Sequence, residues 1–258
     1  SRGFKVEAEQ LIISSGTEYL FYIIFKLFNN GIYGLENPCH KMFKELFLTN
    51  NVSFRAISLD ESGIIIEDLK KYNVNIAYVT PSHQFPTGTI MSISRRTELL
   101  NWANENPNRY IVEDDYDSEF KYTGRPIPAL KATDINDKVI YLGSFSKSIS
   151  PAIRVSYLVL PKALLNIYQR KLPYFICPVP TLNQKILYKF IKEGYFVKHI
   201  NKMRTLYKKK REFLVNTIKT YSSKILDKEI YIQGADAGLH LVIKLDKKIN
   251  EKEFRSII

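Results

Sequence analysis

The chain has 258 residues, of which 45% are hydrophobic and 13% aromatic, and a formal net charge of +12. This composition excludes a disordered chain, and the length suffices for one large domain or for a domain with a smaller appendage. No apolar run approaches the roughly 18–20 residues that span a bilayer, and no signal peptide is visible. Cys39 and Cys177 lie far apart without metal-ligand spacing, which predicts a cytoplasmic protein.

The basic residues are dispersed along the chain as lysines and form no compact nucleic-acid-binding motif. Their densest run, residues 208–211, falls in a stretch with helical periodicity and indicates a solvated helix face. We therefore expect that this chain does not itself recognise DNA.

The first predicted strand, residues 11–13, leads into a turn that contains Ser15, Gly16 and Thr17, and then into a helix at about residues 18–28. A strand, a turn of small residues and a helix N-terminus together favour phosphate binding, because free amide groups and the helix dipole attract an anion. The same tripeptide also serves as an ordinary helix cap, so this signal is weak by itself.

Strands and helices alternate through the next eighty residues. The predicted strands lie at residues 32–36, 52–59 and 76–79, and the predicted helices at residues 38–48, 67–72 and 94–105. Between the last strand and the last helix, residues 80–88 form a loop rich in turn-forming residues. Open α/β sheets bind ligands at the carboxyl ends of their strands, so this loop is a candidate for ligand binding.

Residues 110–117 form an apolar strand that ends in carboxylates and a tyrosine. If the backbone stays extended, Asp114 and Tyr116 project to one side, whereas Asp115 and Asp117 project to the other. A carboxylate can keep a pyridine nitrogen protonated, and a neighbouring phenol can bond a hydroxyl on the same ring. An acidic loop that caps the following turn is an equally good interpretation of these residues alone.

A lysine surrounded by hydroxyl groups follows the buried strand at residues 139–142. Lys147 lies among four serines, including Ser144 and Ser146, and Arg154 follows seven residues later. A lysine amine can form a Schiff base with an aldehyde cofactor, while hydroxyls and a guanidinium hold that cofactor's phosphate. A serine-rich loop with a surface lysine is the alternative, which the acidic strand and the Ser-Gly-Thr turn together disfavour.

Beyond Arg154 a strand at residues 155–160 and a helix at residues 163–171 precede a cluster of three prolines, the best candidate for a domain boundary. Two helices, two strands and the start of a further helix are predicted after it, at residues 181–193, 195–221, 230–233, 239–244 and near the end of the chain. We therefore predict a large α/β domain over residues 1–172 and a smaller α+β domain over residues 173–258.

Taken together, Ser-Gly-Thr, Pro-Thr-Gly, Asp-Asp-Tyr and Ser-Phe-Ser-Lys with a later Arg resemble the fold-type-I pyridoxal-phosphate aminotransferases. More narrowly, TPSHQFPTGTIMSISRR, YIVEDDYDSEF and YLGSFSKSISPAIRVSYLVLP resemble the aminotransferase-like domain of MocR/GabR-type transcription regulators, which belong to the GntR group. The resemblance runs from Ile12 to about Leu245. It implies a mixed, mainly parallel seven-stranded sheet in the large domain, and a C-terminal domain that stops before the end of the family's small domain.

The resemblance also implies a site for pyridoxal 5'-phosphate. Lys147 would carry the cofactor as a Schiff base, Asp114 would hold the pyridine nitrogen, and Tyr116 would bond the ring oxygen. The residues implied around the phosphate are Ser15, Gly16, Thr17, Ser144, Ser146 and Arg154. His40 stands where GabR-type proteins have a tyrosine that stacks on the cofactor ring.

Two further departures from the family pattern concern the ligand. Met42 stands where a GABA-responsive member has an arginine for the carboxylate of its effector, which disfavours a GABA-like ligand. Phe85 precedes Pro86 where the aminotransferases usually have asparagine, so a second contact to the ring oxygen would come from His83, from Gln84 or from neither residue.

Family members carry a winged-helix DNA-binding domain before this region and form head-to-tail homodimers. Nothing in this chain has a winged-helix pattern, so the resemblance implies an isolated effector domain that contacts operator DNA only through that missing domain. It would sense a small-molecule amine, an amino acid or a vitamin B6-related ligand by transaldimination at Lys147. A true class I/II aminotransferase is the alternative, because sensing and transamination need the same residues. A regulator that has lost its cofactor is a third possibility.

Overall fold

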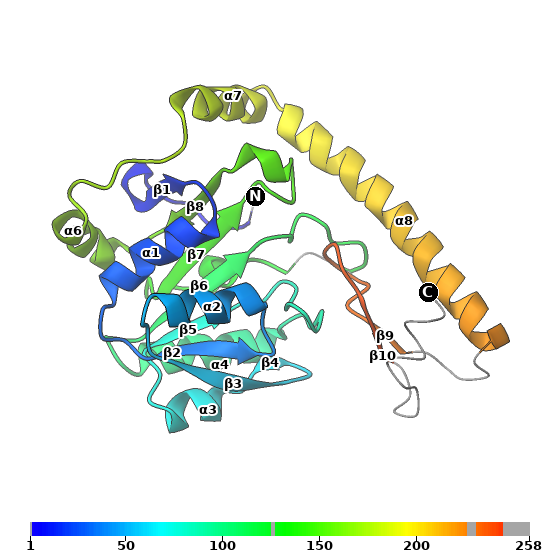
Figure 1. Ribbon diagram of the computed structural model, residues 1–258, viewed down its shortest axis with the longest axis horizontal. Helices are drawn as coiled ribbons and strands as arrows, with labels where there is room; N and C mark the ends of the chain where they lie inside the picture. The colour runs from blue at the N-terminus through cyan, green and yellow to red at the C-terminus, as the bar shows by residue number, and fades with distance from the viewer. Residues whose placement is uncertain (1, 125–126, 226–230, 245–258) are drawn as a thin grey trace.

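The computed structural model describes residues 2–124, 127–225 and 231–244, and it shows an α/β fold built on one large twisted sheet (Figure 1). The strands of this sheet are β1 (Leu11–Ser14), β2 (Tyr33–Asn37), β3 (Phe54–Asp60), β4 (Gly63–Ile64), β5 (Ile76–Val79), β6 (Tyr110–Asp115), β7 (Val139–Ser144) and β8 (Ser156–Val159). Their order across the sheet is β1-β8-β7-β6-β5-β2-β3-β4.

The centre of the sheet is parallel, from β7 through β6, β5 and β2 to β3. At one edge β8 runs antiparallel to both β7 and β1, and at the other edge the two-residue β4 folds back on β3. The sheet is therefore mixed and mainly parallel, as expected. It has eight strands instead of the expected seven, because β4 is too short to leave an alternating pattern in the sequence.

Helices cover both faces of the sheet. Their bounds are α1 (Thr17–Leu27), α2 (Lys41–Thr49), α3 (Ile66–Lys71), α4 (Ile93–Asn104), α5 (Leu130–Thr133), α6 (Lys162–Lys171), α7 (Thr181–Lys192) and α8 (Tyr195–Ile225), with 3-10 turns η1 (Ala8–Gln10) and η2 (Pro151–Ile153). Side chains of α1, α2 and α6 form one hydrophobic core with one face of the strands. Side chains of α3, α4 and α5 form a second core with the other face.

The central strands are buried on both faces, as parallel strands between two helix layers must be. In β5, Ile76 and Tyr78 belong to the first core, whereas Ala77 and Val79 belong to the second. This arrangement leaves the carboxyl ends of the parallel strands as the edge where polar side chains can gather.

The C-terminal part of the chain runs along one side of the sheet (Figure 1). A long helix, α8, is followed by a two-stranded antiparallel sheet of β9 (Tyr231–Gln233) and β10 (Val242–Lys244). The loop between these strands is hydrogen-bonded to the segment after β6, through Gly238 N to Phe120 O at 2.7 Å and Tyr122 N to Asp236 O at 3.0 Å. Strands β9 and β10 and their connecting loop are called the C-terminal hairpin below.

The expected helices and strands lie within a few residues of their predicted bounds. The expected helix start near the end of the chain lies outside the described residues, and the division into domains at residue 172 stays a prediction. Across the described parts of the chain, no helix combines the length and apolarity that a membrane crossing requires.

Candidate functional site

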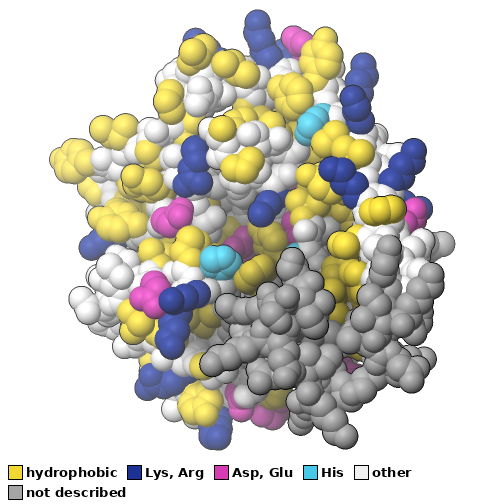
Figure 2. Space-filling model, turned by 45° about the vertical axis from the view of Figure 1, so that its right-hand side comes forward, with side chains coloured by type: hydrophobic (Ala, Val, Ile, Leu, Met, Phe, Trp, Pro, Cys, Tyr) yellow, Lys and Arg dark blue, Asp and Glu magenta, His cyan; other side chains and the backbone are white. Residues whose placement is uncertain are grey.

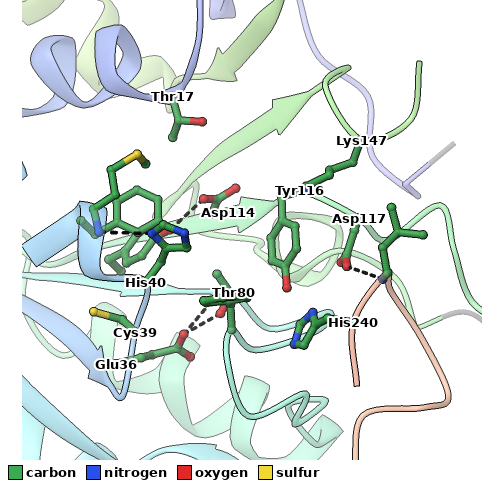
Figure 3. Close-up of a pocket in the computed structure, with 15 residues that line it drawn as sticks. Thr17, Glu36, Cys39, His40, Thr80, Asp114, Tyr116, Asp117, Lys147 and His240 are labelled. Atoms are coloured by element: carbon green, nitrogen blue, oxygen red, sulfur yellow. Dashed lines mark hydrogen bonds between the residues drawn. The ribbon is translucent and has the colours of Figure 1, made fainter. Parts of the chain in front are cut away.

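A cavity of about 290 Å³ opens where the central strands end (Figure 3). Five of the ten site residues named from the sequence line it, whereas Ser15, Gly16, Ser144, Ser146 and Arg154 do not. It lies at the carboxyl ends of β2, β5, β6 and β7, as expected for a sheet of this kind. The lining residues are Thr17, Glu36, Cys39, His40, Met42, Phe43, Tyr78, Thr80, Phe85, Asp114, Tyr116, Asp117, Lys147, Leu239 and His240.

Lys147 extends into this cavity from the loop that follows β7 (Figure 3). Local hydrogen bonds shape the loop: Ser146 N donates to Ser144 Oγ at 3.1 Å, and Phe145 N donates to Val155 O at 3.1 Å. No hydrogen bond or ion pair joins the Lys147 amine to another described residue, and its side chain is exposed. The amine is therefore free to react with a group placed in the cavity.

Asp114 is a buried carboxylate in the wall of the same cavity, near the end of β6. The Tyr78 hydroxyl donates a hydrogen bond of 2.7 Å to its Oδ2 atom. Burial raises the pKa of Asp114 to about 7; the charges of Asp115 and Asp117 also raise it, and the bond from Tyr78 opposes the rise. Tyr78 was not predicted as a site residue, because the buried run of β5 gives the same signal as any core strand.

The register of β6 separates the neighbouring acids as predicted. Asp114 and Tyr116 both line the cavity, whereas Asp115 faces the opposite side and accepts a hydrogen bond from Tyr141. The Tyr116 hydroxyl donates to the backbone oxygen of His83 at 2.7 Å, and burial raises the pKa of this phenol.

The prediction that Asp117 faces away from the cavity is wrong. Strand β6 ends at Asp115, so the alternation of an extended backbone does not continue, and Asp117 turns back to line the cavity. Its Oδ2 atom lies 3.0 Å from His83 Nδ1 and accepts a hydrogen bond of 3.1 Å from Leu239 N. Asp117 thereby joins the central sheet to the C-terminal hairpin.

Both ring nitrogens of the buried His83 have acceptors as partners. Nδ1 contacts Asp117, and Nε2 lies 3.2 Å from the backbone oxygen of Gly234, so both bonds require a proton on each nitrogen. The ring of His240 packs against that of His83 with 4.1 Å between centroids and a tilt of 36°, and burial together with His83 lowers the pKa of His240. These three residues are close enough to ligate a metal, but the two partners of His83 favour a hydrogen-bonded pair instead.

Gly16 and Arg154 meet at the N-terminus of α1. Gly16 has a positive φ of 96°, and a Cβ atom placed there would overlap the Arg154 guanidinium. The guanidinium is largely exposed and lies 3.7 Å from Glu18, a loose ion pair that leaves it free to bind an anion. Thr17 lines the cavity, and Ser15 is half-buried in the same turn. A phosphate group fits this combination of a helix N-terminus and an arginine.

His40 and Phe85 form one wall of the cavity. His40 caps α2 by accepting a hydrogen bond from Met42 N at Nδ1, and its ring lies 5.0 Å from that of Phe85 at an interplanar angle of 40°. Gln84 directs its amide to the backbone oxygens of Pro38 and Phe85. Three residues were candidates for a contact to the ring oxygen of the cofactor: Tyr116, His83 and Gln84. Of these, only Tyr116 lines the cavity.

Glu36, at the end of β2, is a buried acid that the sequence did not single out. It accepts hydrogen bonds from the backbone and the hydroxyl of Thr80, at 3.1 and 2.6 Å. Burial raises the pKa of Glu36 to about 7. A carboxylate that follows an apolar strand was the available signal, the same signal that identified Asp114.

A free amine, a buried carboxylate and an anion site at a helix N-terminus are the groups that a phosphorylated pyridine aldehyde requires. The model of the family Aminotransferase class I and II matches residues 1–258, and the chain belongs to this family. This family implies pyridoxal phosphate as its cofactor, and the residues present fit that group.

The most informative relatives are transcription regulators. The chain is 40% identical over 254 residues to the "Uncharacterized HTH-type transcriptional regulator YdeL" of Bacillus subtilis, covering 98% of this chain and 54% of the relative. It is 30% identical over 254 residues to the "Probable rhizopine catabolism regulatory protein MocR" of Rhizobium meliloti, covering 98% and 50%. The resemblance to MocR-type regulators is thus confirmed, and the chain spans about half the length of these relatives.

Solved structures confirm the fold. The multiple substrate aminotransferase from Thermococcus profundus superposes with a TM-score of 0.81 at 28% identity, over 96% of this chain and 63% of that one. The α-aminoadipate aminotransferase LysN from Thermus thermophilus gives a TM-score of 0.80 at 26% identity, over 96% and 64%. The latter structure is complexed with N-(5'-phosphopyridoxyl)-L-leucine.

Proposed function

We propose that this chain is the effector-sensing, dimerising part of a MocR-type transcription regulator that holds pyridoxal 5'-phosphate at Lys147. The observation that carries the proposal is the Lys147 amine, which bonds none of the described residues and shares one cavity with Asp114 and Tyr116. The names of the regulator relatives support the regulatory role, and the aminotransferase family supports the cofactor.

In this proposal, different residues hold the aldehyde and the pyridine ring of the cofactor. The bound cofactor supplies an aldehyde that exchanges one amine for another and a ring that accepts electrons. The Lys147 amine holds the aldehyde carbon, and ionised Asp114 keeps a proton on the pyridine nitrogen. The bond from Tyr78 serves this purpose, because it favours the charged form of Asp114.

The phosphate is assigned to the turn before α1 and the loop after β7. Gly16 and Thr17 offer the helix N-terminus, Arg154 offers a guanidinium that its ion pair with Glu18 holds only loosely, and hydroxyls complete the set. The hydroxyl groups assigned are those of Ser15, Ser144 and Ser146. His40 is assigned to the face of the ring, with Phe85 behind it.

Sensing follows from the exchange of amines. With the cofactor bound, a ligand amine that replaced the Lys147 amine would leave that basic side chain free in a cavity whose wall includes Leu239 and His240 of the C-terminal hairpin. A change of charge beside the C-terminal hairpin can shift the equilibrium between two conformations of the protein that differ in the position of this hairpin.

A homodimer is part of the proposal, supported by apolar side chains that the monomer leaves in water. Large exposed side chains on α7 and the segment before it are Tyr174, Ile176, Leu182, Ile186 and Tyr188. Large apolar side chains that are exposed on one short segment favour an interaction with another protein surface. Basic side chains are scattered over the face shown in Figure 2. Operator DNA is therefore assigned to another part of the full-length regulator.

A class I/II aminotransferase is the second candidate, favoured by solved structures with the same fold. The residues that would hold the cofactor are common to both functions. A winged helix encoded upstream favours the regulator, whereas steady turnover of an amino donor with a keto acid favours the enzyme.

Borohydride reduction after incubation with pyridoxal phosphate tests the proposal. Peptide mass mapping should find the pyridoxyl group on Lys147, and Lys147→Ala should abolish both the label and the visible absorbance band. Lys202→Ala, which removes an exposed lysine of α8, is the matched control and should be labelled like the wild type. Labelling that persists in Lys147→Ala contradicts the assignment.

A further inference from the structure

The first residues of the chain reach the back of β6, on the side opposite the cavity. Arg2 Nε donates to Asp115 Oδ2 at 2.5 Å, and Nη2 donates to Ser82 Oγ at 2.9 Å. The Asp115 side chain is 1% exposed and that of Arg2 is 22% exposed, so this ion pair is largely shielded from water. A charge pair in such a place is much stronger than one on the surface.

Other contacts fix this segment against the sheet. The backbone oxygen of Arg2 accepts a hydrogen bond from Ala129 N at 3.3 Å, and the Phe4 ring packs edge-on against Tyr141 at 4.9 Å. Tyr141 donates a second hydrogen bond to the Asp115 oxygen that Arg2 binds. Arg2 is therefore held in one position relative to Asp115.

On the side of β6 that faces away from the cavity, there are more acidic side chains than basic side chains that pair with them. Glu113 and Glu119 lie near Asp115, and burial raises the pKa of each to about 7. Arg96 is the other nearby guanidinium, but it donates to backbone oxygens. Among the described residues, only Arg2 forms an ion pair with Asp115.

Asp115 is the chain neighbour of Asp114, and the two carboxylates point to opposite faces of one strand. The titratable groups that face Asp114 on the cavity side are Glu36, Tyr78, Tyr116, Asp117 and Lys147. We propose that Arg2 is a positioning residue of the cofactor site, which neutralises Asp115 and so keeps Asp114 ionised toward the cavity. This inference rests on the proposed role of Asp114 toward pyridoxal phosphate.

The sign of the effect follows from the charges. Uncompensated negative charge on Asp115 raises the pKa of Asp114, because a like charge disfavours ionisation. Loss of Arg2 therefore leaves Asp114 protonated at pH values where the wild type is charged. A protonated Asp114 cannot stabilise the charged pyridine nitrogen, so affinity for the cofactor falls.

The test combines Arg2→Gln, Asp115→Asn and the double variant. Titration with pyridoxal phosphate by visible absorbance should give about a fivefold weaker Kd for Arg2→Gln near pH 7, because a rise of about one unit from a pKa of about 7 lowers the ionised fraction of Asp114 by about that factor. The loss should disappear near pH 9. The double variant should bind like the wild type, because the unpaired charge is gone. Arg95→Gln, which breaks surface ion pairs with Asp60 and Glu98, should bind normally.

A second readout needs no cofactor. Carbon-13 NMR of the aspartate carboxyl groups, with Asp114 assigned through Asp114→Asn, should show a higher pKa for Asp114 in Arg2→Gln than in the wild type. An equal pKa in the two proteins overturns the inference even if the cofactor binds. Weaker binding at every pH, without recovery in the double variant, also overturns it, since this is what simple structural damage produces. Failure of the wild type to bind the cofactor instead contradicts the proposed function.

Discussion

Replacing Asp117 by asparagine should loosen the C-terminal hairpin and weaken cofactor binding. The carboxylate contacts His83 and Leu239 N through one oxygen, and the side chains of Asp117 and His83 are each only 1% exposed. Asparagine keeps one oxygen acceptor but removes the negative charge that faces His83, whose two ring nitrogens both have hydrogen-bond partners. This outcome differs from the sequence-based expectation, which placed Asp117 on the side of the strand that faces away from Asp114 and Tyr116.

The size of the effect follows from the burial of the pair. Breaking a buried ion pair costs about 3–5 kcal/mol when the remaining partner stays charged. The asparagine oxygen can still accept one hydrogen bond, so the expected loss of stability is closer to that of a buried hydrogen bond. We expect the free energy of unfolding to drop by about 1–3 kcal/mol. Because Tyr116 is anchored on the backbone oxygen of His83, cofactor affinity should fall as well.

Urea unfolding and a titration with pyridoxal phosphate measure the two effects separately. Asp236→Asn is the matched control, since it removes an exposed carboxylate of the same hairpin that bonds Thr123. This control should change stability by less than about 0.5 kcal/mol and leave binding intact. The reasoning is refuted if Asp117→Asn and Asp236→Asn behave alike in both measurements.

Two further predictions concern the phosphate end and the pH dependence. Gly16→Ala should cost about 1–3 kcal/mol of stability from its positive φ and also weaken cofactor binding, because the added Cβ would displace the Arg154 guanidinium. Gly194→Ala shares the positive φ but has open space, so in the same thermal unfolding and titration assays it should lose stability only. In the cofactor-free protein, Glu113 and Asp114 have pKa values raised to about 7, so the folded state binds protons that the unfolded state has lost. The free energy of unfolding, measured with urea, should therefore fall as pH rises from about 5 to 7; a rise would contradict these pKa values.

The sheet could be predicted because the hydrophobic pattern of each strand is local. Strand β5 was predicted at its observed bounds, since a four-residue apolar run between turn formers has few alternatives. The two-residue β4 was missed because its pairing depends on β3 and not on its own sequence. The cavity was predictable for a related reason: polar residues directly after buried strands gather at one edge of a parallel sheet.

Contacts between distant segments could not be predicted from such patterns. His83 and Asp117 each stand in a loop, and nothing local shows that one side chain bonds the other or that both hold residues near position 234. The bond from Tyr78 to Asp114 joins two strands whose neighbouring positions in the sheet no local pattern specifies. The prediction for Asp117 failed where it extended the alternation of a strand two residues beyond the end of that strand.

Because side chains alternate along β6, adjacent residues of this strand reach the two opposite faces of the sheet. Asp114 faces the cavity and Asp115 faces the segment that begins at Arg2, and a one-residue step separates the two carboxylates. Because buried like charges oppose each other's ionisation, the proposed role of Arg2 implies that a change in the contact between Arg2 and Asp115 would alter the charge of Asp114, and that the reverse would also hold. The hairpin reaches the same cavity from the other side through Asp117. The cavity therefore lies between two segments that are far apart in the sequence, and the acids that contact them stand at the end of β6 and two residues beyond it.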